Sequence, residues 1–121
     1  MTPDPTADGK ALSRVRQWLC GTAVVLDLVG PLSGPGVSVL RRELATALVR
    51  RSIPLLVLDA TRAGDLDPDV GLVVTGAGRH AREAGGLLIV VGWPEPVPPP
   101  DGVELRATLE QALSELARTK S

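Results

Sequence analysis

Two short apolar runs constrain the fold of this chain more than any other feature. They are IPLLVLDA at 53–60 and LLIVVG at 87–92. A strand that is apolar at nearly every position is covered on both faces, as in the middle of a mostly parallel sheet. Parallel strands need a crossover connection, which is usually a helix. The two runs therefore predict an α/β fold with right-handed crossovers.

Three further segments precede the first run. Residues 22–30, TAVVLDLVG, predict a strand with alternate apolar residues on one face and Asp27, at least partly exposed, on the other. Residues 37–51 predict an amphipathic helix whose Val, Leu and Ala residues form one inward stripe. Residues 10–20 fit either a helix or an edge strand, because their apolar residues suit both periods. The helix is slightly favoured there.

The two ends of the chain and one internal segment complete the organisation. Residues 1–9 are polar with two prolines and predict a frayed tail ahead of one domain at 10–121. Residues 94–102 are too rich in proline for a helix or a sheet, which predicts an extended surface segment. A short strand and a closing helix follow, with Thr108 and Gln111 as a capping-box pair.

Composition and charge exclude several classes of function. The 121 residues carry a net charge of −1 and include no Phe or Tyr, so a basic footprint and stacking platforms for nucleic-acid bases are both lacking. One cysteine, Cys20, and one histidine, His80, build neither a structural zinc site nor an internal disulfide. No apolar run is long enough to span a membrane, and the N-terminus lacks the pattern of a signal peptide. We expect a cytoplasmic protein.

The stretch GLVVTGAGRHAREAGG, at 71–86, has two incompatible interpretations. Gly76, Gly78 and Ala81 formally meet the pattern G-x-G-x-x-A of a dinucleotide-binding turn. The chain would then be a small NAD(P)-binding module. That interpretation needs a strand at 71–75, where the apolar run is short and begins with glycine. It is kept as the alternative function.

A helix explains more of the residues in this stretch. Asp67 suits the N-cap, Pro68 the first helical position and Asp69 the positive end of the helix dipole. Apolar residues at 70, 73, 74, 77, 81 and 84 then keep helical spacing until two glycines end it. The two internal glycines cost about 1 kcal/mol each relative to alanine. Burial of six apolar side chains, at roughly 25 cal/mol per Å², exceeds that cost, so the internal glycines are predicted to form a close-packing face.

The order of these segments resembles the STAS family, whose members include bacterial anti-sigma factor antagonists. VVLDLVGPLS is similar to the second strand and turn of the family, and LLVLDA is similar to its central strand. DLDPDVGLVVTGAGRHAREAGGLLIVV resembles the helix start, helix and following strand, and TLEQALSEL resembles the closing helix. The resemblance covers residues 22–93 and 103–117. It implies a mixed, mostly parallel sheet of four to five strands with helices packed mainly on one face.

The resemblance also implies a function. In the family, a partner kinase that is also an anti-sigma factor phosphorylates a serine at the start of this helix. Here Val70 occupies the acceptor position, Pro68 that of the family aspartate and Ser33 that of an acidic turn residue, while PEPVPPP replaces the usual helix between the last two strands. We therefore expect a non-catalytic interaction domain that is not phosphorylated at Val70. Its partner would be an anti-sigma kinase-like protein or another STAS protein, and a homodimer is left open.

The expected partner-binding surface combines the turn after residues 22–30 with the helix start, and its members are Ser33, Asp67, Asp69, Val70, Gly71 and Leu72. Outside it, Asp59 is read as a carboxylate that accepts loop amides near Thr61, and His80 as a solvated residue on a helix flank. Trp93 fits either a lid on the core or an exposed docking anchor. Because no nucleophile–base pair stands out, we expect no catalytic residue, cofactor or metal.

Overall fold

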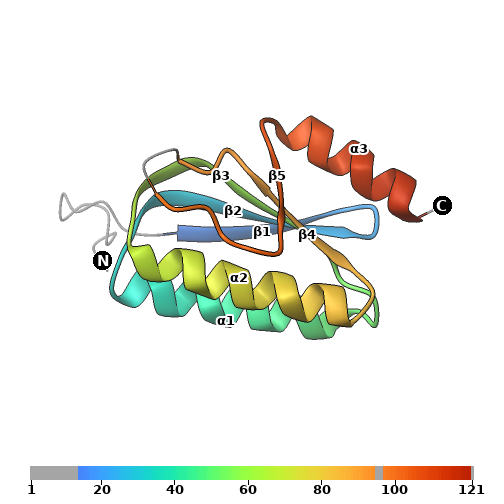
Figure 1. Cartoon of the computed structure of the whole chain (residues 1–121), viewed down its shortest axis with the longest axis horizontal. Coiled ribbons are helices and arrows are strands. Elements are labelled where there is room, and N and C mark those ends of the chain that lie inside the picture. Colours follow the sequence, from blue (N-terminus) through green and yellow to red (C-terminus); the bar gives the residue numbers. More distant parts are fainter. Residues whose placement is uncertain (1–13, 95–96, 121) are drawn as a thin grey trace, which may run out of the picture.

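The two apolar runs form neighbouring parallel strands, β3 and β4, of one five-stranded sheet (Figure 1). The structure, a computed structural model, describes residues 14–94 and 97–120. The strands follow one another across the sheet in chain order, and among these described residues only β1 and β2 pair antiparallel. The predicted mixed, mostly parallel sheet is therefore confirmed. The strand bounds are Arg14–Cys20 for β1, Ala23–Leu32 for β2, Leu55–Leu66 for β3, Leu87–Val91 for β4 and Glu104–Arg106 for β5.

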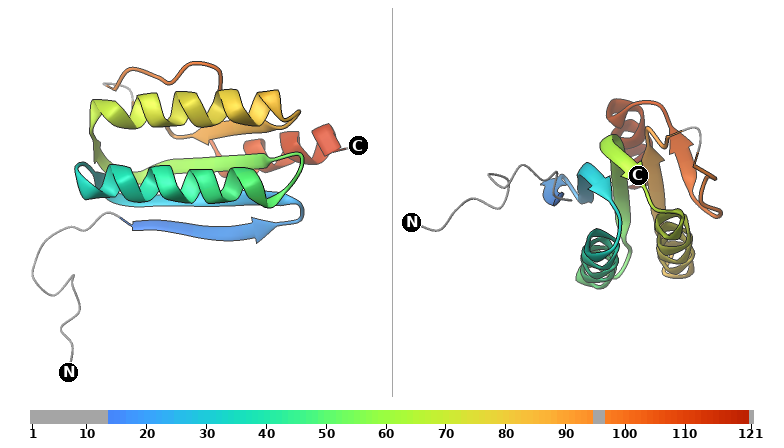
Figure 2. Two further views of the ribbon diagram at one scale, coloured as in Figure 1. Left: turned by 90° about the horizontal axis from the view of Figure 1, so that it is seen from below. Right: turned by 90° about the vertical axis from the view of Figure 1, so that its left-hand side faces the viewer.

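In the described part of the chain, three helices cover the sheet. They span Pro35–Arg50 in α1, Pro68–Glu83 in α2 and Leu109–Lys120 in α3. α1 and α2 run side by side on one face, where they connect β2 to β3 and β3 to β4 (Figures 1 and 2). α3 packs against the other face at one end of the sheet. The helices thus lie mainly on one face, as predicted.

Burial on both faces explains the unbroken apolar runs. Because neighbouring residues of a strand point to opposite faces, β3 and β4 need apolar residues at consecutive positions. The side chains facing α1 and α2 include Leu56, Leu58, Leu88 and Val90. Those on the α3 side form a second buried cluster with the helix, comprising Ala23, Val25, Leu55, Val57, Ile89, Val91, Ala112 and Leu116.

Residues 14–20 correct the preference for a helix at 10–20. They form β1, which pairs with β2 from Arg14 opposite Val29 to Cys20 opposite Ala23. Pairing with a neighbouring strand at seven positions outweighs the helical spacing of the apolar residues, which is a weak preference by itself. The edge-strand alternative is therefore correct. Residues 10–13 and the predicted tail at 1–9 lie outside the described residues.

Asp27 also differs from the prediction, because it is only 5% exposed. Its carboxylate forms an ion pair with the guanidinium of Arg62 on the neighbouring strand β3. Burial of an unpaired charge is strongly unfavourable, so a carboxylate in this place needs such a partner. Its second oxygen, Oδ1, has no hydrogen-bond partner within the described part of the chain.

Residues 92–103 connect β4 to β5, and the described part of this connection contains no helix. Its final part, residues 97–103, lies along α2, where the backbone N–H of Asp101 donates to the hydroxyl of Thr75 over 3.0 Å. The indole N–H of Trp93 donates to the carbonyl of Val97 over 3.0 Å, and the ring packs on the core cluster under the helices. Trp93 is therefore a lid on the core. The described part of the predicted extended segment packs against α2.

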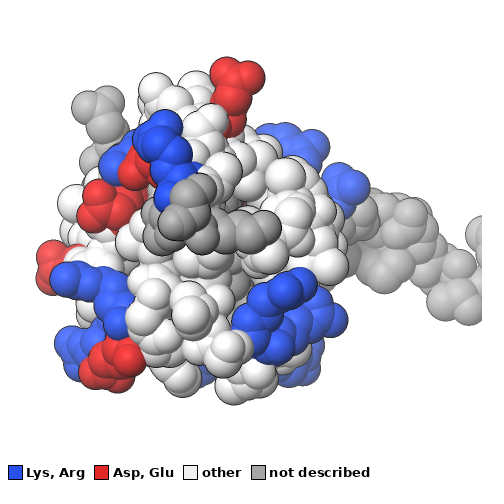
Figure 3. Space-filling model, turned by 90° about the vertical axis from the view of Figure 1, so that its right-hand side faces the viewer, with Lys and Arg blue, Asp and Glu red and all other residues white. Residues whose placement is uncertain are grey.

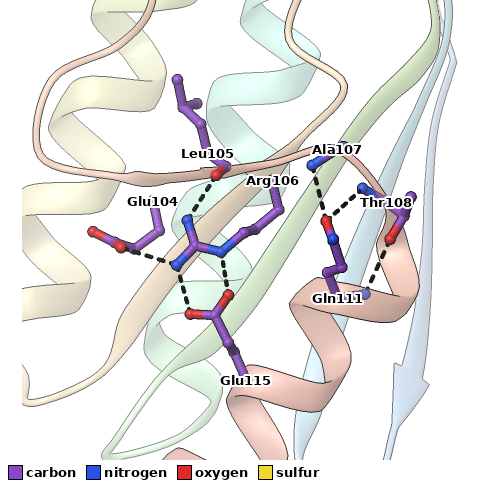
Figure 4. A network of polar contacts seen from close by, with 7 residues as sticks. All are labelled: Glu104, Leu105, Arg106, Ala107, Thr108, Gln111 and Glu115. Carbon is purple, nitrogen blue, oxygen red and sulfur yellow. Dashed lines mark hydrogen bonds and ion pairs between the residues drawn. The ribbon is translucent and has the colours of Figure 1, made fainter.

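A polar network fastens α3 to β5 (Figure 4). Nε and Nη2 of Arg106 both donate to the carboxylate of Glu115, and Nη2 also lies 3.2 Å from Oε1 of Glu104. The hydrogen bond lowers the pKa of the Glu115 carboxyl below its ordinary value and raises the pKa of the Arg106 guanidinium. At the helix start, Gln111 N–H donates to the hydroxyl of Thr108 over 3.2 Å, and Thr108 N–H donates back to Oε1 of Gln111 over 3.4 Å. The predicted capping box is therefore confirmed.

Candidate functional site

Helix α2 begins as predicted. Oδ1 of Asp67 accepts the backbone N–H of Asp69 over 2.9 Å, and the carbonyl of Asp67 accepts that of Val70 over 2.9 Å. Pro68 stands in the first turn, where the helix needs no N–H from it. The helix start is thus fixed by its own residues, and its positive dipole end lies at two carboxylates.

The turn after β2 brings Ser33 to the same end of the molecule. β2 and β3 stay paired up to Leu32 and Leu66, and the N–H of Asp67 donates to the carbonyl of Leu32 over 2.8 Å. In the turn itself, the carbonyl of Ser33 accepts the N–H of Gly36 over 3.0 Å. The starts of α1 and α2 therefore lie next to each other at one end of the sheet (Figure 1).

Most of the expected contact residues reach the surface there. Ser33, Asp69 and Leu72 are exposed, and Leu72 has 71% of its surface open to solvent. Asp67 and Gly71 are half-buried. An apolar side chain, a carboxylate and a hydroxyl thus share one end of the molecule. We call Ser33, Asp67, Asp69, Gly71 and Leu72 the helix-start surface.

Val70 differs from the other expected contact residues because it is completely buried. It belongs to the inward stripe of α2 and to the core cluster under the helices. A side chain in that position lies beneath the surface, so a partner does not touch it. We therefore leave Val70 out of the helix-start surface.

A shallow groove of about 360 Å³ lies between α1 and α2, with Leu72 among its lining residues. Small and apolar side chains such as Ala45 and Ala77 contribute to it, together with Arg41 and His80. A Cβ built on Gly76 in the same groove meets no atom within 4 Å. The groove extends the apolar part of the helix-start surface along both helices, and the sequence analysis did not place it.

The dinucleotide-binding interpretation does not fit the structure. Residues 68–83 form one continuous helix, so Gly76 and Gly78 lie in its middle and not in a turn after a strand. A Cβ on Gly78 would lie 2.5 Å from Cγ1 of Val103 and 3.1 Å from the carbonyl oxygen of Gly102. Gly78 therefore has the predicted close-packing role, whereas Gly76 leaves open space.

The proline-rich segment borders the helix-start surface, which the sequence analysis also missed. A Cβ on Gly71 would lie 3.6 Å from the carbonyl oxygen of Pro98. Farther along the helix, Thr75, Gly78 and Arg82 meet the end of the same segment. Positions 71, 75, 78 and 82 follow helical spacing, so one face of α2, with small residues at the first three of these positions and an arginine at the last, faces the segment. The small residues at 71, 75 and 78 were the sequence feature from which the packing of residues 97–103 against α2 could have been predicted.

The remaining candidates have local roles. Oδ1 of Asp59 accepts the backbone N–H of Thr61 over 3.0 Å and its hydroxyl over 2.6 Å, which matches the prediction for this carboxylate. His80 is exposed on α2. Within residues 14–94 and 97–120, no group of three or more His, Cys, Asp or Glu side chains is placed to hold a metal ion. None of the described helices combines the length and apolar character required to span a bilayer.

Solved structures of anti-sigma factor antagonists share this architecture. The antagonist SpoIIAA in its unphosphorylated form aligns with a TM-score of 0.67 and 18% identity, over 88% of this chain and 98% of that chain. A putative antagonist from Thermotoga maritima gives a TM-score of 0.72 and 15% identity, over 86% of this chain and 95% of that chain. A variant of RsbS from Moorella thermoacetica gives a TM-score of 0.73 and 20% identity, over 89% of this chain and 98% of that chain. No protein-family model and no curated protein sequence matches the chain.

These likenesses identify the fold as that of STAS domains, the class to which anti-sigma factor antagonists belong. The alignments cover nearly the whole of each solved chain, so the likeness concerns the complete fold and not one motif. At sequence identities of 15 to 20%, it establishes the fold. The resemblance read from the order of the sequence segments is thereby confirmed.

Proposed function

We propose that this chain is a non-catalytic protein-interaction domain that binds its partner through the helix-start surface. The observation that carries the proposal is Leu72, which is 71% exposed beside Asp69 on a helix start fixed by its own caps. A large apolar side chain next to a groove is typical of a protein–protein contact site. A rigid start of α2 also limits the entropy that is lost on binding.

The fold supports a class of partner. Two of the solved proteins with this fold are named as an anti-sigma factor antagonist and a putative one, and the name indicates that such proteins act on anti-sigma factors. We propose an anti-sigma kinase-like protein or another STAS protein as the partner, and regulation of transcription as the process. The contact would combine an apolar pocket for Leu72 with a basic or N–H donor group for Asp69.

We also propose that phosphorylation at the usual position does not control this interaction. Val70 stands there, has no hydroxyl and lies in the core. Negative charge at the helix start comes from Asp67 and from Asp69, whose side chain is exposed. Such a charge is present without a kinase, and the positive dipole end of α2 favours it.

Paired substitutions test the surface. Leu72→Lys and Val49→Lys replace aliphatic side chains that are 71% and 74% exposed, at the start of α2 and near the end of α1. We expect Leu72→Lys to weaken binding of a purified anti-sigma kinase-like or STAS partner at least tenfold, about 1.4 kcal/mol, in titration calorimetry. Val49→Lys is the matched control and is expected to bind like the wild type. Equal binding by both variants would refute the proposed surface.

A kinase assay tests the second part. The chain is incubated with the binding partner and labelled ATP, and the label is mapped by mass spectrometry. We expect none on residues 67–75. Label on that segment would contradict the proposal. Label found only on other segments would agree with it, because the position of Val70 would still be unphosphorylated.

A further inference from the structure

Strand β1 leaves one long edge of the sheet open. It is seven residues long, and within residues 14–94 and 97–120 it pairs only with β2. Figure 2 shows β1 along one border of the sheet with no helix on its outer side. The opposite border, β5, has only three residues. An edge strand directs unpaired N–H and C=O groups outward, which makes β1 the place where a further strand fits.

The side chains of β1 are also unusually apolar for an open edge. Trp18 is 42% exposed, Leu19 is 54% exposed and Cys20 is exposed. Three consecutive exposed residues of this kind mark an interaction surface, and tryptophan is enriched where proteins meet. Natural edge strands are normally protected by charges, and here Arg14 and Arg16 provide the only ones.

We propose that two copies of this chain associate through β1, antiparallel and centred on Gln17. In this arrangement all seven residues find a partner, because Gln17 faces Gln17 of the second copy and Arg14 faces its Cys20. Arg16 then faces Trp18, and Val15 faces Leu19. The two five-stranded sheets become one continuous sheet of twice that size.

The register within the monomer supports this arrangement. β1 pairs with β2 so that Arg16 lies opposite Asp27 and Trp18 opposite Val25, which places both β1 residues on the α3 face of the sheet. Across the two-fold axis, the guanidinium of Arg16 would meet the indole of Trp18 from the second copy, a favourable cation–π pair. Each Arg16 therefore has an attractive neighbour, and a charge that protects an open edge becomes part of the contact.

The other face of β1 is equally complementary. Val15 lies opposite Leu28 of β2, on the side of α1 and α2, and Leu19 lies on the same side. In the proposed arrangement these two residues form apolar cross-strand pairs with each other. An axis through Arg16 would instead place the two Arg16 side chains against each other. An axis through Trp18 would leave Arg14 and Val15 without partners, so Gln17 is the centre that the side chains favour.

Disulfide formation reports the register directly. Cys20 is the only cysteine, and in the proposed dimer the two Cys20 residues are about 20 Å apart, too far for a disulfide. On a Cys20→Ser background, Gln17→Cys places two thiols across the axis at a Cα separation of about 5 Å, within disulfide range. The matched control is Ile53→Cys on the same background, since Ile53 is 56% exposed and lies away from β1. We expect a covalent dimer from the first variant at a rate at least tenfold above that of the second.

Sedimentation equilibrium of the full chain measures the association itself. Trp18→Lys places a cation against Arg16 of the second copy and is expected to weaken the dimer at least tenfold. Leu105→Lys, on the β5 edge and also 42% exposed in the wild type, is expected to have no effect. A monomer up to about 1 mM chain, a dimer insensitive to Trp18→Lys, or equal cross-linking at positions 17 and 53 would each overturn the proposal. None of these residues belongs to the helix-start surface, so partner binding is tested independently.

Discussion

Two glycines on α2 allow the packing of the proline-rich segment to be measured. Replacement of either by alanine gains about 1 kcal/mol of helix propensity. A Cβ on Gly76 meets no atom within 4 Å, whereas one on Gly78 would lie 2.5 Å from Cγ1 of Val103 and 3.1 Å from the carbonyl oxygen of Gly102. Gly76→Ala is therefore expected to raise the free energy of unfolding by about 1 kcal/mol and the Tm by roughly 4 °C.

Gly78→Ala is expected to have the opposite effect. The new methyl group must displace Val103 and move the backbone at Gly102, and overpacking of this kind costs about 1–3 kcal/mol. After the gain in propensity, the net destabilisation is about 1 kcal/mol, so the two alanine variants differ by about 2 kcal/mol. Urea unfolding followed by far-UV circular dichroism resolves that difference. On a Val103→Ala background the clash with Cγ1 is absent, and we expect a coupling of about 1 kcal/mol between the two substitutions.

Two results would refute this reasoning. If Gly78→Ala stabilises the protein as much as Gly76→Ala and shows no coupling to Val103, residues 97–103 do not pack against α2. If Gly76→Ala destabilises the protein by 1 kcal/mol or more, that position is not an exposed site in a helix, because alanine is the best helix former at such a site. The first result would also mean that the proline-rich segment does not border the helix-start surface.

Three further experiments test contacts that stabilise the fold. Asp67→Ala removes the N-cap of α2 and is expected to lower the free energy of unfolding by about 1 kcal/mol in a urea titration; an unchanged midpoint would contradict the cap. Because Arg106 lowers the pKa of Glu115, the ionised carboxylate stabilises the fold above its unfolded-state pKa and loses this effect as the pH falls through its folded-state pKa. Glu115→Gln is thus expected to lower the Tm at neutral pH, with a deficit that shrinks below about pH 4; a deficit independent of pH would argue against the ion pair. Arg62→Met leaves buried Asp27 unpaired and is expected to cost about 2 kcal/mol, whereas addition of Asp27→Val restores most of the stability. A double variant less stable than Arg62→Met would show that the carboxylate does not depend on this partner.

Local signals account for the parts of the fold that were predicted well. The structure starts α2 at Pro68 with Asp67 as the N-cap, as the Asp-Pro-Asp sequence indicates. The other end is equally local, because the N–H of Gly86 donates to the carbonyl of Ala81 over 2.7 Å, and Gly85 adopts φ +82°. Caps, prolines and positive-φ glycines act within a few residues, so a single sequence contains the information for them.

Features that depend on distant residues were missed. β1 is a strand because β2 offers a pairing partner, and the spacing of apolar residues at 10–20 says nothing about that partner. Asp27 is buried because Arg62, 35 positions later in the chain, reaches its carboxylate. The register between β2 and β3 shifts between Asp27 and Val29, so that Arg62 lies opposite Val29, and the sequence pattern does not indicate this shift. Both errors concern which strands meet and in what register.

The candidate site shows two lines of sequence reasoning in conflict. Alignment with the family motif placed Val70 at the surface, as the counterpart of a phosphate acceptor. Helical periodicity placed the same residue in the inward stripe with Val74 and Ala77, and the structure agrees with the periodicity. Burial of a valine stabilises the core, and nothing at this position requires exposure. The groove between α1 and α2 could not be predicted from the sequence, because it depends on how the two helices pack side by side.

An inward valine changes what the start of α2 can do. A phosphorylated helix start alternates between two charge states, and its affinity for a partner alternates with them. Here the exposed groups are Asp69, Leu72 and a hydroxyl on the neighbouring turn, and none of them needs a modification to present its surface. Under the proposed function, control of binding has to act on the partner or on the amount of free chain. The self-association proposed for β1 uses no residue of the helix-start surface, so both copies of a dimer would still present that surface to the partner.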